Sequence, residues 1–170
     1  RRSGLLTLSG FLKWEASPTE ENLIKRGAFA NTAFLCATLP PPPDDVPPLP
    51  AGDDGQTLRE RIETHTSGCG GMCHNDLINP VGFAFGNYDE NGMYQTYEGT
   101  PLVAGPWGDT PIDASGTYAF EDGEGSYDNA VGLAEQMATR AQVHRCYAAH
   151  LLAYMESRGT TSDDEERQRL

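Results

Sequence analysis

Two cysteines and a histidine in the middle of the chain have the residue types and the spacing to hold a haem. They lie in the segment from Cys69 to His74, in which Cys73 is the second cysteine. In a C-x-x-C-H segment both sulfurs bond to the edge of the porphyrin, and the following histidine binds the iron. One more residue separates the cysteines here, but Gly70 and Gly71 have the backbone freedom to bring both sulfurs to the ring. We therefore predict a covalent haem c on Cys69, Cys73 and His74, with His74 as the iron ligand.

Two other interpretations of this segment stay open. One is a zinc site with His65 as a further ligand, although the adjacent side chains of Cys73 and His74 diverge and rarely meet on one small ion. The other is a plain Cys69–Cys73 disulfide, or a pair of free thiols. Since the spacing is one residue longer than in the standard motif, the sequence alone does not choose among the three.

The second axial ligand of the iron has several candidates. Leu58, Ile62 and His65 fall on one face of a predicted helix, and His65 lies nine residues before His74. Met137 follows sixty-three residues after His74 and offers a thioether. A methionine ligand raises the reduction potential relative to a histidine, so this choice affects which redox partners the domain can serve. The other side chains that could take this place are Met93, His144 and His150.

The two remaining cysteines lie far apart in the sequence. Cys36 follows Phe34 and Leu35 near the end of one predicted helix, and Cys146 lies beside the apolar stripe of the last one. We predict a Cys36–Cys146 disulfide, with two free buried thiols as the alternative. Disulfides and covalent haem both fit an oxidising compartment, so we expect a periplasmic or extracellular protein.

The composition is strongly acidic. The 170 residues include 12 Lys and Arg against 25 Asp and Glu, which gives a net charge of -13. This charge disfavours nucleic acid and anionic membranes and favours either a basic protein partner or plain solubility. No stretch approaches the roughly 18 apolar residues that a membrane span needs. Because the sequence starts at Arg1 without a methionine, we expect a processed product or a piece of a larger polypeptide. The expected partner is a redox protein or the other domains of that polypeptide.

The apolar periodicity predicts a mainly α-helical fold with a small β-hairpin and long Pro/Gly-rich loops. A capping-box pattern at 17–20 starts a helix predicted from Pro18 to about Leu39. A Pro-rich surface connector over 40–55 follows, and a second capping box at 57–60 starts the next helix. We expect residues 1–158 to form a single haem-binding domain and residues 159–170 a disordered charged tail.

The second half of the chain combines aromatic, glycine-rich and helical segments. Aromatic residues between 80 and 97 could wall a haem pocket or simply form core. The segment 111–120 predicts a small hairpin, and two helices follow it. The apolar stripes expected on these helices are Val131, Ala134 and Ala138, and then Val143, Tyr147, His150, Leu151 and Tyr154.

Calcium is a further prediction for the cofactors of this chain. Asn87, Asp89, Asn91, Gly92 and Glu98 occupy positions 1, 3, 5, 6 and 12 of a calcium-loop pattern. The loop needs a helix on each side, whereas the residues after it have the pattern of a strand. The alternative is a turn in which the side chains bond nearby backbone amides. We find no pattern of hydrolytic catalysis and assign no catalytic residue.

Several phrases of the sequence together resemble the C-terminal domains of the large cytochrome-c-like proteins of planctomycetes and myxobacteria, an uncharacterised family. That family has C-x-x-C-H, then an Asp-Pro-Leu-Gly-Phe phrase and an Asn-Phe-Asp phrase. This chain differs by the extra residue before Cys73, by Asn79 in place of aspartate, and by Gly86 in place of glutamate. The resemblance covers residues 3 to about 158 and implies a cytochrome-c-like haem domain that ends a longer protein. The matching phrases are 3–7, Lys25-Arg26-Gly27, 35–43, 57–61 with His65, Cys73-His74, 79–85, 87–89, Gly92 and 112–116.

Three functions therefore follow from the sequence as hypotheses. The first is a c-type cytochrome domain that transfers electrons outside the cytoplasm through one covalent haem. The second is a haem enzyme in which the iron has an open position. The third is a structural or interaction module of a larger surface protein, stabilised by disulfides and without a cofactor. Of these we expect a non-catalytic electron-transfer protein.

Overall fold

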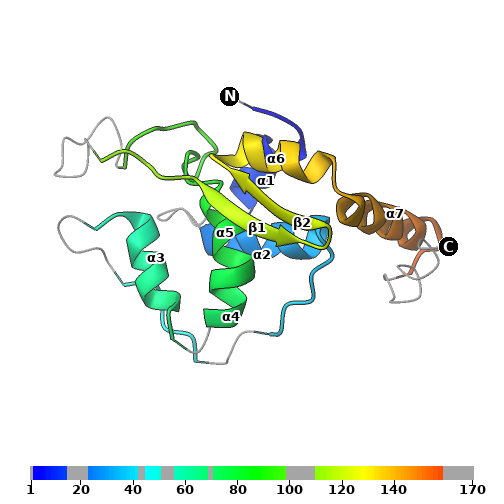
Figure 1. Cartoon of the computed structure of the whole chain (residues 1–170), viewed down its shortest axis with the longest axis horizontal. Helices are drawn as coiled ribbons and strands as arrows, with labels where there is room; N and C mark the ends of the chain where they lie inside the picture. Colours follow the sequence, from blue (N-terminus) through cyan, green and yellow to red (C-terminus); the bar gives the residue numbers. More distant parts are fainter. Residues whose placement is uncertain are drawn as a thin grey trace.

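The computed structural model describes residues 2–14, 23–41, 45–50, 56–68, 71–98 and 110–158. As predicted, these residues form a mainly α-helical fold with one two-stranded antiparallel sheet (Figure 1). The predicted capping box at 17–20, the end of the connector and the tail 159–170 lie outside them. The elements are η1 (Leu5–Thr7), α1 (Ser9–Trp14), α2 (Leu23–Phe34), α3 (Leu58–Thr66), α4 (Gly71–Cys73), η2 (His74–Ile78), α5 (Asn79–Phe83), β1 (Gly116–Phe120), β2 (Gly123–Tyr127), α6 (Ala130–Ala138) and α7 (Ala141–Met155).

Helices α2 and α5 cross at close range, and this crossing positions the segment that carries His74. A Cβ atom on Gly27 would lie 2.3 Å from a backbone carbonyl oxygen of η2, and one on Gly82 would lie 2.5 Å from a carbonyl oxygen of α2. Glycine is needed at both positions because the two backbones are in direct contact. Asn31, one turn after Gly27, donates from Nδ2 to the carbonyl oxygen of Leu77 at 2.9 Å and fixes the two segments together.

The helical segment from α4 to α5 contains a π turn, η2, in its middle. A proline inside a helix has no N–H to donate, and its ring clashes with the carbonyl four residues before it. Pro80 stands at the start of α5, and the helix widens just ahead of it, where the N–H of Asn79 bonds to the carbonyl of His74. Such π turns are often found at functional sites. This one begins at His74, directly after Cys73.

Arg26 of α2 is fully buried and ties three segments together. Its guanidinium donates to the carbonyl oxygens of Leu12, Tyr88 and Asp89 at 2.8 to 3.1 Å. A buried charge is tolerated only where its hydrogen-bonding groups are satisfied, as they are by these carbonyls. Arg26 therefore holds α1 and the chain that follows α5 against α2.

The β-hairpin covers one side of this helical core (Figure 1). In the register Gly116 pairs with Tyr127 and Phe120 with Gly123. The small hairpin is therefore confirmed, but it lies further along the chain than predicted: the segment 111–120 contains only its first strand. Tyr118, Phe120 and Tyr127 point inward and are buried. The hydroxyl of Tyr118 donates to Oδ1 of the α2 asparagine at 2.8 Å, and burial raises the pKa of Tyr118 to about 12.

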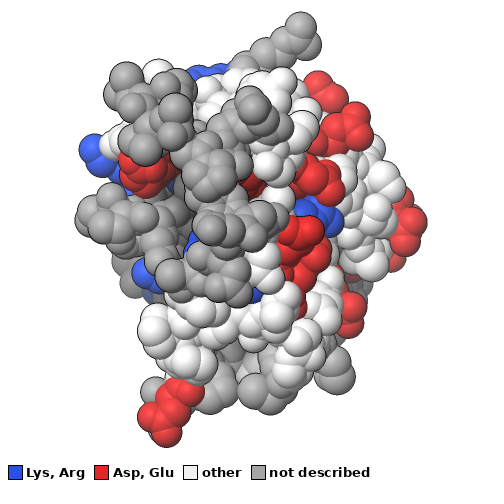
Figure 2. Space-filling model, turned by 90° about the vertical axis from the view of Figure 1, so that its left-hand side faces the viewer, with Lys and Arg blue, Asp and Glu red and all other residues white. Residues whose placement is uncertain are grey.

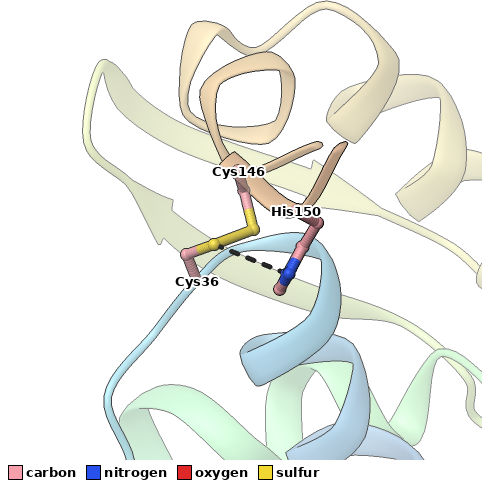
Figure 3. A group of neighbouring side chains, drawn as sticks. All are labelled: Cys36, Cys146 and His150. Carbon is pink, nitrogen blue, oxygen red and sulfur yellow. Dashed lines mark hydrogen bonds between the residues drawn. A yellow bond between two sulfur atoms is a disulfide. The ribbon is translucent and has the colours of Figure 1, made fainter. Parts of the chain in front are cut away.

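Helix α2 ends at Phe34, earlier than the predicted Leu39. Cys36 has a φ of 50°, in the left-handed region, and the N–H of Ala37 turns back to the carbonyl of Asn31 at 2.9 Å. A left-handed residue ends a helix because the next N–H can no longer continue the ladder. The turn directs the sulfur of Cys36 toward α7 (Figure 3).

The last two helices lie where the sequence predicts them, but their buried faces are different. Val131 and Ala134 of α6 are only partly buried, and Tyr147, Leu151 and Tyr154 of α7 are exposed. The small side chains of α7 face the core instead, which lets the helix pack closely and leaves its aromatic rings toward solvent. The residues buried on these helices are Ala130, Leu133, Met137, Cys146, Ala149 and Ala153.

The described part of the Pro-rich connector lies on the surface. Residues 45–48 of the Pro-rich connector are exposed, and Leu49 packs against the core. Among the described helices, none combines the length and the apolar character of a membrane span.

Candidate functional site around His74

Cys73 and His74 lie at the junction of α4 and η2, both partly buried. Cys69, the other predicted haem anchor, lies outside the described residues. Helices α2, α3 and α5 all pack against η2, so the main chain at His74 is held from several sides. This packing gives the histidine a defined position, as a metal ligand requires.

A chain of hydrogen bonds fixes which nitrogen of His74 carries the proton. Thr66 donates its hydroxyl hydrogen to the carbonyl oxygen of Ile62 at 2.7 Å, so its oxygen accepts from Nδ2 of Asn79 at 2.9 Å. That bond turns Oδ1 of Asn79 toward Nδ1 of His74, at 3.3 Å. An amide oxygen only accepts, so Nδ1 of His74 must be protonated. The lone pair is then on Nε2, and the ring can bind a metal ion through that atom.

Asn79 is a candidate site residue that the sequence motifs did not single out. It is buried, it differs from the aspartate of the resembling family, and its side chain is the link between His74 and Thr66. In metal sites a ligating histidine commonly donates its other N–H to such an acceptor, which sets the tautomer and the orientation of the ring. The available signal was an asparagine five residues after His74 and directly before a proline.

The two candidates for the second axial ligand lie in different surroundings. His65 is on α3, which packs against η2, and its Nε2 lies 3.1 Å from the carbonyl oxygen of Pro47 in the connector. Met137 is buried in the core on α6. Helix α6 contacts β2, η1 and α7, and in Figure 1 it lies near the top of the view with α4 near the bottom.

The aromatic residues that could have walled a haem pocket belong largely to the core. Phe83, Phe85 and Tyr88 are buried in the main apolar cluster, and Phe85 packs against Phe11 with 5.4 Å between ring centroids. Tyr94 stacks edge-on against Tyr88 and is about half exposed. Phe85 and Tyr88 therefore serve the core, whereas Phe83 also lines an open cavity.

A small open cavity of about 360 Å³ lies between α3, α5 and β1. Arg59 lines this cavity. Its guanidinium pairs with Glu63 and Asp113, both at 3.0 Å, and lies 4.5 Å from the centroid of the Phe83 ring. The pKa of Asp113 is lowered, mainly because the hydroxyl of Ser115 donates to its carboxylate. The residues that line the cavity are Arg59, Glu63, Asn75, Asn79, Pro80, Phe83, Gly116 and Thr117.

The predicted calcium segment folds as a tight turn. Oδ1 of Asp89 accepts from the backbone N–H groups of Asn91 and Met93 at 2.9 and 2.7 Å, and Asn87 donates its amide to a carbonyl across the turn. Burial raises the pKa of Glu98. Residues 93–98 form no helix, so the described segment lacks the helix pair of a calcium loop. Calcium binding stays a prediction.

The disulfide between Cys36 and Cys146 is confirmed, and it joins the end of α2 to α7 with 5.5 Å between the Cα atoms. The sulfur of Cys146 is buried and lies 3.7 Å from the carbonyl oxygen of Ala33. His150, one turn further along α7, lies next to the sulfur of Cys36 (Figure 3).

Acidic side chains are conspicuous on the described surface. Figure 2 shows several of them gathered on one side of the face that α3 occupies, with basic side chains fewer and scattered. Several described basic residues are neutralised locally: Arg140 pairs with Asp122 at 2.9 Å, and Arg145 pairs with Glu121.

Comparison with known proteins gives a result at the level of a family. The model of the PSCyt3 family, described as a protein of unknown function (DUF1588), matches residues 2–98, which is more than half of the chain. The chain belongs to this family. The PSCyt3 match includes Cys73, His74 and Asn79 and ends before β1. No curated protein and no solved structure matches significantly.

Proposed function

We propose that this PSCyt3 protein is a c-type cytochrome domain that carries one covalent haem and transfers electrons outside the cytoplasm. Cys69 and Cys73 would anchor the haem, and His74 would bind its iron. The family's name hints at a cytochrome, and the resemblance to the cytochrome-c-like proteins of planctomycetes and myxobacteria agrees with it. The bound haem would supply one-electron transfer, and the protein's residues would orient it and tune its potential.

The observation that carries this proposal is the contact between Nδ1 of His74 and Oδ1 of Asn79, at 3.3 Å. Because that amide oxygen only accepts, Nδ1 carries a proton, and in the neutral ring the lone pair of Nε2 is available to a metal. Thr66 in turn sets the orientation of this buried asparagine, so the imidazole is held in one position, as a metal ligand requires. The arrangement therefore fits an iron ligand better than a residue that only fills space.

The second axial ligand is a finer part of the proposal. His65 lies on α3, against η2, and is favoured over Met137 because α3 and η2 are in contact. To bind iron through Nε2, His65 would have to release the carbonyl of Pro47. A change in the connector would therefore accompany a second histidine ligand. If His65 keeps its bond to Pro47 and no other side chain takes its place, the iron has an open position, and the haem-enzyme alternative applies.

The extracytoplasmic location rests on the thiol chemistry. The confirmed Cys36–Cys146 disulfide and a covalent haem are both products of oxidising compartments. We propose the periplasm or the extracellular space for this domain, with a redox protein or another domain of a larger polypeptide as its partner. The net charge of -13 favours a basic docking surface on that partner.

The test is production of the full chain in a host that attaches haem c, followed by a visible spectrum of the purified, denatured protein. We expect a Soret band that persists in denaturant, because the haem is covalently held. His74→Ala should shift or abolish the spectrum of the native protein, whereas the matched variant His144→Ala should not. His144 is a suitable control because it lies on α7, where its Nε2 faces the carbonyl of Ala138. Colourless protein from such a host would contradict the proposal.

A cofactor-free structural module is the second candidate, and one observation favours it. Phe83, Phe85 and Tyr88 are buried among the other side chains of the main apolar cluster. The described fold therefore needs no haem to complete this cluster. A module of this kind would give a colourless protein with the same helix content and thermal stability whether or not haem attachment is available.

Carbon monoxide separates the two haem hypotheses, since it binds readily only where the iron has an open position.

A further inference from the structure

The Cys36–Cys146 disulfide has a third potential metal ligand beside it. Nε2 of His150 lies 3.8 Å from the sulfur of Cys36, and the three donor atoms of Cys36, Cys146 and His150 all lie within 4.8 Å of one another (Figure 3). Neither the predicted haem site nor the PSCyt3 match accounts for this cluster, since two of its members follow residue 98.

We propose that this cluster is a redox-dependent metal site, in which reduction of the disulfide creates a Cys2His site for one zinc ion. In the oxidised protein the two sulfurs are bonded to each other and do not serve as thiolate ligands. In the reduced protein two thiolates and one imidazole supply three ligands of the types that zinc prefers, and water completes the tetrahedron. The ion then links the end of α2 to α7 in place of the disulfide.

The local structure supports chelation by two residues of α7. Cys146 and His150 are four residues apart on one helix, so their side chains lie on the same face, one turn from each other. Two ligands at this spacing on a rigid helix are held near each other without a further loss of chain entropy. Cys36 comes from the turn after α2, and Gln142 of α7 donates to the carbonyl of Leu35 at 3.0 Å, which fixes that turn against the helix.

The distances fit zinc after a small rearrangement. With Zn–S bonds of about 2.3 Å and a Zn–N bond of about 2.05 Å, a tetrahedral site separates the sulfurs by about 3.8 Å and each sulfur from the nitrogen by about 3.6 Å. His150 already lies at nearly this distance from Cys36. The Cα atoms of Cys36 and Cys146 are 5.5 Å apart, so rotation of their side chains separates the sulfurs enough without a shift of the backbone.

Exposure and charge also suit a metal ion that enters from solvent. Cys146 is buried, Cys36 is partly buried and His150 is exposed, so the site opens outward on the imidazole side. The fourth ligand position is then accessible to water. The protein's charge of -13 raises the local concentration of cations.

The chemistry balances with a dithiol as reductant. The dithiol transfers two electrons and two protons to the Cys36–Cys146 bond, which gives two cysteine thiols, and is itself oxidised to a cyclic disulfide. Zinc binding then releases the two thiol protons as the thiolates bind, while His150 binds through a neutral nitrogen. No other oxidant or reductant is needed.

The test uses the full chain with Cys69→Ser and Cys73→Ser, so that Cys36 and Cys146 carry the only thiols and the result does not depend on haem. The protein is reduced with a dithiol without oxygen, freed of reductant and titrated with Co²⁺ as a coloured probe. We expect one Co²⁺ per chain with the visible bands of tetrahedral cobalt and a thiolate charge-transfer band, both removed by one equivalent of Zn²⁺. The oxidised protein should show neither band.

Matched variants on α7 identify the third ligand. In the same background His150→Ala should weaken Co²⁺ binding by at least about tenfold, whereas His144→Ala should leave it unchanged. Equal binding by both variants, equal binding by the oxidised protein, or no uptake by the reduced protein would overturn the proposal. Far-ultraviolet circular dichroism covers the case in which reduction unfolds the chain: recovery of helix with one equivalent of Zn²⁺ supports the site, and failure to recover contradicts it.

Discussion

Removal of the Cys36–Cys146 disulfide should lower the free energy of unfolding by about 5 kcal/mol. The bridge joins residues 110 positions apart, and in the chain-entropy model a loop of that length restricts the unfolded chain by about 16 cal/mol/K. At 25 °C this entropy corresponds to about 5 kcal/mol, which is a third or more of the stability of an ordinary domain. The disulfide would then be a dominant contributor to the stability of this fold.

The assay is equilibrium unfolding in urea with a chelator present, so that no metal replaces the bridge. The double variant Cys36→Ala and Cys146→Ala should lose about 5 kcal/mol, with roughly 1 kcal/mol of additional loss from the small cavity at buried Cys146. Its m value should rise, because an unfolded chain without the cross-link exposes more surface. Wild-type protein unfolded under a reductant is the control and should show the loss of about 5 kcal/mol without the cavity contribution, since both cysteine side chains remain. A change smaller than about 1 kcal/mol would refute the reasoning.

Three further predictions follow from individual contacts. Gly27→Ala should destabilise the fold by about 3 kcal/mol, because its Cβ has no room at the helix crossing, whereas Gly10→Ala, which points into open space, should be neutral or slightly stabilising in thermal unfolding. In haem-free protein, nitrogen NMR should find that the neutral imidazole of His74 carries its proton on Nδ1, and Asn79→Leu should abolish that preference. A neutral His74 that carries its proton on Nε2 in the wild type would contradict the hydrogen-bond assignment. The pKa of Glu98 is raised by burial, so its contribution to stability is greatest below its ordinary value of 4.5 and is lost as the pH rises through the folded-state pKa. The glutamine in the Glu98→Gln variant does not ionise, so the melting temperature of the variant minus that of the wild type should increase from pH 4 to pH 7. The same difference at both pH values would show that burial does not affect the ionisation of Glu98.

The features that the sequence predicted well depend on local rules or on simple pairing. The capping box at Thr57 forms both of its hydrogen bonds with Glu60, because the pattern itself specifies the geometry of one helical turn. The Cys36–Cys146 disulfide followed from two cysteines beside apolar helical segments. The small hairpin followed from a strand pattern beside turn residues, and the pairing of β1 with β2 confirms that it forms.

The features that the sequence did not predict depend on contacts between distant elements. In a regular α-helix a residue five positions after His74 lies about 140° around the axis, so nothing in the pattern suggests that Asn79 reaches the imidazole. The π turn before Pro80 brings the two side chains together. Arg26 has the residue type of a surface position and yet is buried, because carbonyl groups from two other segments surround its guanidinium.

The buried face of α7 is a third such case. Periodicity favoured the larger side chains at Tyr147, Leu151 and Tyr154, but the neighbouring face of small residues with Cys146 is the one in the core. The disulfide requires the same orientation, since a bond to Cys36 needs Cys146 to face α2. The apolar pattern of one helix contains no information about this long-range bond.

The central claim is that porphyrin is bonded to Cys69 and Cys73. Mass spectrometry of the denatured protein, from a host that attaches haem c, tests this most directly when combined with proteolysis and sequencing of the peptide that contains both cysteines. We expect a mass increase of about 600 Da on that peptide, with both sulfurs resistant to alkylation. A peptide without added mass, whose two cysteines are bonded to each other or free to react, would contradict it.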